Sequence, residues 1–427
     1  MSLINSIFNT GEILKDLEKQ DLLRKCPAVT RIWDDEDPGK SGSRFAMTGS
    51  GPLLNFASND YLGLSTHPAI LRALREGMEK YGAGSGASPL VTGLCPVHEE
   101  LMERFRAITG KEGVLLFSTG FSANQALMKA FMTLNAGLYL DRLSHASMQD
   151  MAFYAKRISR FRHNDAAHLE KLLRKSPGPG VIATEGVFSM DGDQAPLKKL
   201  LSLREQYRTP LILDDAHGFG VLGRQGHGSP DYQGTGFQNI DVYMGTFSKA
   251  LGLSGAFAAG DRDFTDFMVN TSREYIYSTM APAFLAQGTL KALDIIEGSE
   301  GAELRSHLRA LIRRFQNAMK SLLPECCPGS ETAIQPVIIG DAGVMMRVSE
   351  ELKEAGILLG SIRPPTVPRG SARLRITLTA AHREEDADFL AEKLHQIIRR
   401  LGQEGYGTQP PAEQHTGAAF PDREENL

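Results

Sequence analysis

The stretch PLILDDAHGFG (210–220) decides the fold, because a continuous apolar run ends there in charged and polar residues. Three further runs have the same form: GVLLF (113–117), GVIAT (180–184) and DVYMG (241–245). Helical patterns separate these runs, and apolar runs of this length between helices are typical of buried parallel strands. The sequence therefore predicts an α/β domain with a mostly parallel sheet and helices on both faces.

The sequence pattern changes on both sides of this domain. Before it, residues 1–25 predict one amphipathic helix with Ile13, Leu14, Leu17 and Leu22 on one side. After it, helical patterns alternate with the strand-like AIQPVIIG (333–340) and RLRITLT (373–379). We expect, in order, an N-terminal helix and turn segment (1–54), the large α/β domain (55–296), a smaller C-terminal α+β domain (297–402) and a disordered polar tail (403–427).

Composition limits the class of protein. The chain has 427 residues, a formal net charge of −4 and no block of Lys or Arg, which argues against a nucleic-acid partner. The N-terminus lacks the pattern of a signal peptide, and no apolar run approaches the roughly 20 residues that span a bilayer. Four cysteines without a CxxC spacing predict neither a disulfide framework nor a metal site. We expect a cytoplasmic protein without a membrane partner.

Polar residues follow each apolar run, and the carboxyl ends of parallel strands meet at one edge of a sheet. Together they match what pyridoxal 5′-phosphate (PLP) requires: an amine, an anion beside the pyridine nitrogen, and donors for the phosphate. Lys249 supplies an amine and Asp214 an anion, whereas the adjacent Asp215 is expected to point to the opposite face and to matter less. Gly120 and Phe121 open a predicted helix, whose N-terminus favours a phosphate. Singly, such residues are more often surface lysines, helix caps or turn glycines.

GFGVLG (218–223) has the GxGxxG spacing of a dinucleotide-binding motif. That motif should open a helix, but the following RQGHGSPDYQGTG (224–236) is too rich in Gly and Pro. We therefore expect a flexible loop beside the site, and a nucleotide-dependent oxidoreductase is disfavoured.

The chain resembles the α-oxoamine synthase family of fold-type I PLP enzymes over about residues 10–400. The resemblance rests on ordered motifs: NFASNDYLGLSTHP (55–68), YGAGSGAS (81–88), LVTG (90–93), STGFSAN (118–124), DRLSHAS (141–147), RFRHND (160–165), TEGVFSMDGDQAPL (184–197), LDDAHGFGVLG (213–223) and GTFSKALG (245–252). Pro89 departs from the family, whose members often carry Arg or Gly there. Within the family, IRPPTVPRGSARLRITLTAAH (362–382) and IYST (276–279) most resemble the branch that uses L-alanine and a pimeloyl thioester.

The resemblance implies roles for individual residues. Lys249 matches the Schiff-base lysine, Asp214 the partner of the pyridine nitrogen, and His217 the residue at the ring's phenolic oxygen. His145 matches the histidine that stacks on the ring and touches substrate. Further implied cofactor contacts are Ser189, Thr246 and the backbone of Gly120 and Phe121, with Thr279 reaching the phosphate of a neighbouring subunit in a homodimer with shared sites. The implied substrate contacts are Arg24, Asn59, Thr366 and Arg375.

The implied reaction is a decarboxylative condensation of L-alanine with pimeloyl-CoA or a pimeloyl acyl carrier protein. Its products are 8-amino-7-oxononanoate, CO2 and free CoA or carrier, in biotin biosynthesis, with Lys249 removing the α-proton. A sister activity that joins glycine to succinyl-CoA or acetyl-CoA would keep the same cofactor motifs. A non-catalytic binding paralogue would be expected to have lost Lys249. The distal carboxylate of the pimeloyl chain needs a polar or cationic partner, which the sequence alone does not locate.

Overall fold

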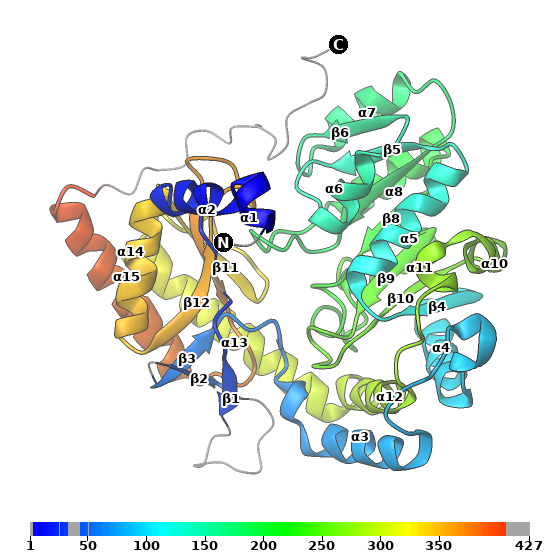
Figure 1. The fold of residues 1–427 in the computed structure, drawn as a ribbon, viewed down its shortest axis with the longest axis horizontal. Helices are drawn as coiled ribbons and strands as arrows, with labels where there is room; N and C mark the ends of the chain where they lie inside the picture. Colours follow the sequence, from blue (N-terminus) through cyan, green and yellow to red (C-terminus); the bar gives the residue numbers. More distant parts are fainter. Residues whose placement is uncertain (1–2, 25, 33–42, 50, 407–427) are drawn as a thin grey trace.

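The computed structural model describes residues 3–24, 26–32, 43–49 and 51–406, which form two lobes, each around one sheet (Figure 1). The sheet of the larger lobe has seven strands. Their spatial order is β4 (Gly113–Phe117), β10 (Ala256–Gly260), β9 (Val242–Thr246), β8 (Leu211–Asp214), β7 (Gly180–Glu185), β5 (Gly137–Asp141) and β6 (Ile158–Phe161). Only β10 runs antiparallel to its neighbours. The four predicted strands and the mostly parallel sheet are confirmed.

Helices cover both faces of this sheet, as the sequence predicts. Alternate residues of β4 show why: Leu115 packs into one apolar cluster and Leu116 into the other. One face carries α5 (Gly120–Thr133), α6 (Ala146–Ala152), α10 (Arg262–Thr271) and α11 (Arg273–Ile276). The other carries α4 (Pro96–Thr109), α7 (Ala166–Arg174) and α8 (Leu197–Tyr207).

The second lobe contains a six-stranded sheet. Its order is β1 (Thr30–Ile32), β2 (Phe45–Thr48), β3 (Gly51–Phe56), β12 (Ile357–Ile362), β13 (Ala372–Thr377) and β11 (Ile334–Gly340). The expected C-terminal helices are α13 (Ser299–Leu322), α14 (Ala342–Glu354) and α15 (Glu384–Gln403). The parallel pairing of β3 with β12 joins the N-terminal segment to the C-terminal sheet, a pairing that the sequence pattern did not reveal.

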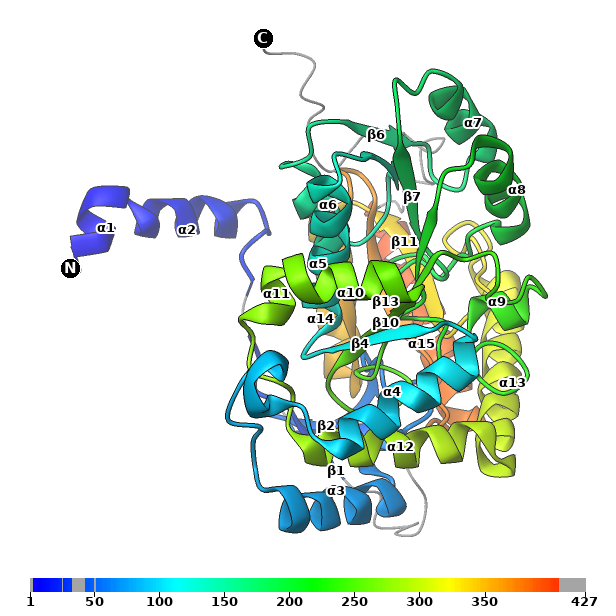
Figure 2. The ribbon, with the colours of Figure 1, turned by 90° about the vertical axis from the view of Figure 1, so that its right-hand side faces the viewer.

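Short elements and one helix pair connect the lobes. Helices α3 (Pro68–Tyr81) and α12 (Ala283–Glu297) lie side by side, and α12 leads into α13 (Figures 1 and 2). The remaining elements are α9 (Ser229–Tyr232), a 3-10 turn (Leu64–Thr66) and a π-helical turn (Pro89–Gly93), which begins at the unusual Pro89. GFGVLG (218–223) opens no helix, as expected. Its side chains Phe219, Val221 and Leu222 are buried in the core, and the expected flexibility of this loop stays a prediction.

The expected single helix over 1–25 is wrong. The chain forms α1 (Leu3–Phe8) and α2 (Thr10–Lys19), which are separated at Asn9, whose φ of 50° is a left-handed conformation that asparagine tolerates. Both helices project from the body, and Ile13 and Leu14 are exposed (Figure 2). The tail expected to be disordered (403–427) begins inside α15, because Gln403 is the last residue of that helix. Residues 407–427 lie outside the described part of the chain, as do residues 33–42 of the N-terminal turn segment. No helix in the described ranges is both long and apolar enough to cross a membrane.

Candidate active site

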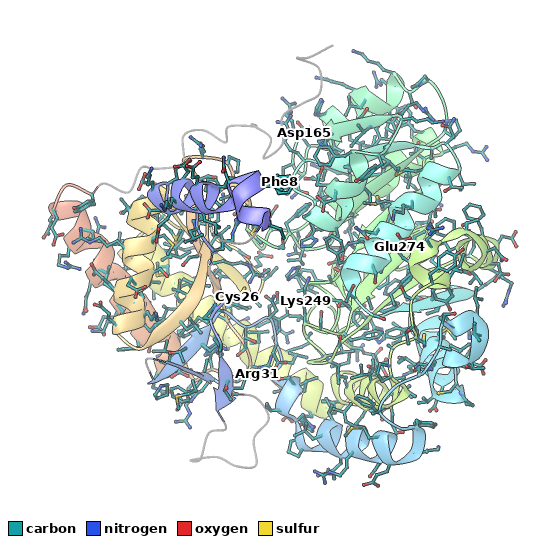
Figure 3. The ribbon with its side chains drawn as sticks, in the orientation of Figure 1. Phe8, Cys26, Arg31, Asp165, Lys249 and Glu274 are labelled. Carbon is teal, nitrogen blue, oxygen red and sulfur yellow. The ribbon has the colours of Figure 1, made fainter. Side chains whose placement is uncertain are left out.

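A cavity of about 240 Å³ lies at the carboxyl ends of the strands of the larger sheet. Its walls come from the segments that follow β4, β5, β7, β8 and β9. Of the residues singled out from the sequence, it is lined by Gly120, Phe121, His145, Asp214, His217, Thr246 and Lys249. Figure 3 shows Lys249 at the inner side of the larger lobe, facing the second lobe. We call this space the cofactor cavity.

Asp214 is a buried carboxylate whose hydrogen-bond donors, among the described residues, are neutral groups. It is 4% exposed, and it accepts hydrogen bonds from Asn124 Nδ2 at 2.6 Å and from the N–H of Ala216 at 2.9 Å. These donors fix the carboxylate without neutralising it, so its charge remains available to a cation in the cavity. Sequence reasoning quoted Asn124 within a motif but gave it no role. The sequence feature that could have indicated a role for Asn124 is its spacing of four residues from Gly120, which places both residues on one side of α5.

Lys249 and Glu185 also line the cofactor cavity, and both are buried ionisable groups. Burial lowers the pKa of Lys249 to about 8, although the charges of Asp214 and Glu185 act in the opposite direction. Burial, with the nearby charge of Asp214, raises the pKa of Glu185 well above its usual range. Glu185 Oε1 accepts a 2.5 Å hydrogen bond from the N–H of His145 and so positions the next loop. Glu185 had no predicted role, although its position at the end of a buried strand could have indicated one.

Two histidines face the cavity as neutral groups. His145 caps α6: its Nδ1 lies 2.8 Å from Ser147 Oγ, and burial lowers the pKa of its ring. His217 Nδ1 lies 2.5 Å from Tyr61 Oη, and burial holds the pKa of His217 well below its usual range. Neutral imidazoles can accept as well as donate hydrogen bonds, which suits contact with a polar ring and with substrate.

The start of α5 and the end of β9 also line the cofactor cavity. Thr119 Oγ1 caps α5 by accepting from the N–H of Ser122 at 3.1 Å, and Gly120 and Phe121 line the cavity. Thr246 Oγ1 lies 2.8 Å from Ser248 Oγ and donates to the Gly255 carbonyl at 2.9 Å. Helix N-termini and hydroxyls bind phosphate. An amine, an unneutralised carboxylate and this phosphate site therefore fit PLP within one cavity.

A second cavity of about 340 Å³ adjoins the first, because His145 lines both. Its walls also carry Arg24, Ser189 and Thr366. Arg24 Nη2 donates to Thr366 Oγ1 at 3.2 Å and to the Pro364 carbonyl at 3.5 Å, so two predicted substrate residues meet. We call this space the donor cavity.

The other predicted substrate residues, Asn59 and Arg375, contact each other, and Arg375 also contacts the backbone of Ser189. Arg375 Nε donates to the Ser189 carbonyl at 2.6 Å, and its Nη1 donates to Asn59 Oδ1 at 3.0 Å. Its Nη1 also donates to Thr377 Oγ1 at 3.0 Å. Thr279 lies on the surface, outside both cavities, and its expected role in a neighbouring subunit stays a prediction.

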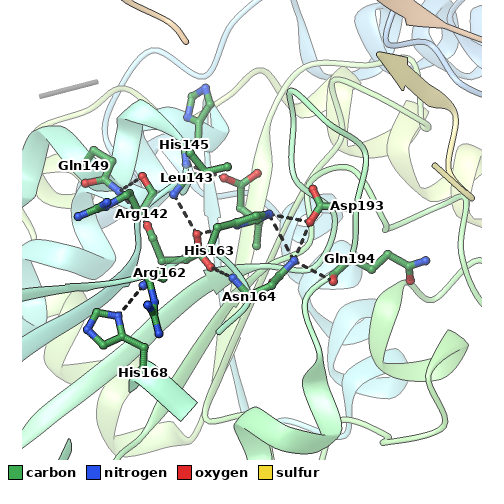
Figure 4. A network of polar contacts seen from close by, with 12 residues as sticks. Arg142, Leu143, His145, Gln149, Arg162, His163, Asn164, His168, Asp193 and Gln194 are labelled. Carbon is green, nitrogen blue, oxygen red and sulfur yellow. Dashed lines mark hydrogen bonds and ion pairs between the residues drawn. The ribbon is translucent and has the colours of Figure 1, made fainter. Parts of the chain in front are cut away.

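A network of polar contacts supports the loops between the two cavities (Figure 4). His163 Nδ1 lies 2.9 Å from Asp141 Oδ1, and its Nε2 lies 2.7 Å from Asp193 Oδ2. Burial alone would lower the pKa of His163, but its hydrogen bonds to both aspartates raise that pKa to about 10. His163 is therefore a cation at neutral pH, and it ties the end of β5 to the loop that carries Ser189.

Known proteins resemble this chain in sequence and in fold. Residues 51–394 match the family described as aminotransferase class I and II. The 8-amino-7-oxononanoate synthase of Aeromonas hydrophila is 44% identical over 92% of this chain and 96% of its own length. A serine palmitoyltransferase from S. paucimobilis with bound PLP and myriocin has a TM-score of 0.83 at 25% identity, covering 94% of this chain and 100% of that one. An 8-amino-7-oxononanoate synthase from Francisella tularensis has a TM-score of 0.70 at 25% identity, covering 82% and 98%.

Proposed function

Because the chain belongs to the aminotransferase class I and II family and, within it, to the 8-amino-7-oxononanoate synthases, we propose that the cofactor and donor cavities together condense L-alanine with a pimeloyl thioester. The chain is a PLP-dependent acyltransferase of biotin biosynthesis. The products of the condensation are 8-amino-7-oxononanoate, CO2 and the free thiol of CoA or of a carrier protein. The observation that carries the assignment of roles is the Asp214 carboxylate, which neutral donors hold in the same cavity as Lys249.

PLP, when bound, supplies an electron sink that stabilises negative charge on the α-carbon of an amino acid joined to it. Asp214 would hold the pyridine nitrogen in its protonated form, since its carboxylate has no cationic partner hydrogen-bonded to it in the described ranges. Asn124 holds Asp214 in place for this role. Lys249 would anchor the cofactor, and its free amine would take the α-proton of alanine. A pKa near 8 suits this step, because both forms of the amine are populated at neutral pH.

The remaining residues orient the two substrates. Arg375, whose guanidinium is held by the Ser189 carbonyl and Asn59, would bind the carboxylate of alanine. His145 lines both cavities, so it lies where the amino acid and the acyl thioester must meet. Arg24 and Thr366 contact the acyl thioester in the donor cavity. We further propose that two chains form a homodimer in which Thr279 reaches the phosphate site of the partner. The thiol carrier is coenzyme A or an acyl carrier protein.

The test is a direct assay with the purified protein, PLP and pimeloyl-CoA, offered alanine or glycine, with product masses measured. We expect 8-amino-7-oxononanoate from alanine. Borohydride reduction should fix a pyridoxyl group on Lys249, and peptide mass mapping would locate it. A label on another lysine would contradict the assignment of the cavity. Condensation of glycine with a short acyl-CoA, without activity toward pimeloyl-CoA, would contradict the proposed substrates while leaving the cofactor site standing.

A further inference from the structure

The donor cavity contains a guanidinium group that forms no ion pair with any acidic side chain of the described residues. Arg142 follows β5, and its backbone is fixed: its N–H donates to the Phe161 carbonyl at 3.0 Å, and its carbonyl accepts from Gln149 Nε2 at 3.4 Å. Its side chain lines the donor cavity. Within the described part of the chain, this guanidinium makes no hydrogen bond or ion pair, and its Nε is buried without a partner.

The other cations of the donor cavity are engaged. Arg373 forms an ion pair with Asp191. Arg160 Nε donates to Gln149 Oε1 at 3.0 Å, and Arg24 donates to Thr366. A partly buried cation without a partner is costly unless an anion completes its hydrogen bonds. Arg142 therefore marks a place for an anionic group of a ligand.

The position of Arg142 fits the far end of an acyl chain. It lies three residues from His145, so the two Cα atoms are at most about 11 Å apart along the chain (Figure 4). The apolar side chains of Leu143, Phe188 and Val367 line the same cavity. A thioester carbonyl beside His145 would thus be followed by methylenes against apolar walls, with a cation at the end.

We propose that Arg142 binds the distal carboxylate of the acyl donor and thereby selects dicarboxylic acyl thioesters over monocarboxylic ones of equal length. The inference rests on the proposed function, because it assumes that an acyl thioester enters the donor cavity. The planar guanidinium suits the two oxygens of a carboxylate, and hydrogen bonds of this charged kind are stronger than neutral ones.

The experiment compares pimeloyl-CoA with heptanoyl-CoA, which has the same chain length without the distal carboxylate. Both are tested on the PLP-loaded wild-type protein and on Arg142→Met, which keeps an apolar stem. We expect Arg142→Met to lower kcat/KM for pimeloyl-CoA by about 10- to 100-fold, and for heptanoyl-CoA by less than about threefold. Arg142→Lys, which keeps the charge but not the paired donors, should recover part of the loss.

The matched control is Arg162→Met, because Arg162 is exposed and pairs with Asp165 at 2.7 Å, outside the donor cavity. Arg162→Met should leave kcat/KM unchanged for both pimeloyl-CoA and heptanoyl-CoA. Equal losses for both donors with Arg142→Met would overturn the proposal, because they would assign Arg142 to the CoA phosphates or to the loop. Unchanged kinetics would also overturn it. A wild-type protein that condenses alanine with neither thioester would instead contradict the proposed function, which separates the two failures.

Discussion

The cofactor cavity and the donor cavity share His145 but are built in opposite ways. The first is made of neighbouring strand ends of one sheet, and its charged group Asp214 is buried and held by neutral donors. The second brings together Arg24 and Thr366, which are 342 residues apart in the chain and are both exposed. In the proposed function, the rigid sheet therefore holds the reacting groups, whereas segments from both ends of the chain would contact the part of the substrate that differs among acyl donors.

The largest expected effect tests the electrostatics of the cofactor cavity. Asp214→Asn should keep its fold but lose the α-proton exchange of alanine by about 10²- to 10³-fold, because the amide cannot hold the pyridine nitrogen protonated. The measurement is deuterium incorporation into alanine, followed by NMR without an acyl donor. Exchange at the wild-type rate would mean that Asp214 only stabilises the fold.

Asp215→Asn is the matched variant. As expected for an adjacent residue that points to the opposite face, Asp215 does not line the cofactor cavity. Its side chain is instead fully buried and accepts from Ser229 N–H, Ser229 Oγ and Tyr243 Oη. Its replacement should cost about 1–3 kcal/mol of stability, seen in urea unfolding, while the exchange rate of the folded fraction changes little. The two neighbouring carboxylates would then separate chemistry from stability.

The next effect concerns the loops that join the two cavities. The pKa of His163 is raised from 6.5 to about 10 in the folded protein, so the folded state binds the proton more tightly than the unfolded state. Its contribution to stability is therefore complete below about pH 6.5 and is lost as the pH rises toward 10. His163→Gln should lower the free energy of unfolding by about 3 kcal/mol at pH 6, because Asp141 and Asp193 lose their shared cation.

Urea unfolding at pH 6 and at pH 9.5 measures this difference, which should shrink at the higher pH. His168→Gln is the control, since its Nδ1 accepts only the N–H of Arg162 at 2.9 Å and it contacts neither Asp141 nor Asp193. An equal loss of stability at both pH values would contradict a charged His163.

The same contrast explains what the sequence could predict. Most of the cofactor cavity could be predicted, because four of its segments follow apolar runs directly and parallel strands must bring these ends together. The segment with His145 follows β5, which was not among these four runs. The break of the N-terminal helix at Asn9 could not be predicted, because nothing in the spacing of its apolar residues marks that position. The pairing of β3 with β12 joins segments about 300 residues apart and depends on tertiary packing rather than on local pattern. Asn124, Glu185 and Arg142 stood inside quoted motifs, but only their contacts reveal what each does.

The smallest expected effect tests whether Arg24 and Thr366, which form an exposed hydrogen bond in the donor cavity, act on the acyl donor together. Arg24→Ala should raise KM for pimeloyl-CoA about three- to tenfold and leave KM for alanine unchanged, because one exposed hydrogen bond contributes little. Thr366→Val removes the acceptor of the same contact and should act alike. If Arg24 serves the donor through Thr366, the double variant should be no worse than either single one. Lys19→Ala on α2, whose amine lies 3.3 Å from Asp16, is the control for changes in N-terminal charge. Additive effects would mean that the two side chains contact the donor independently, and a matching rise in KM for alanine would place Arg24 in the cofactor cavity instead.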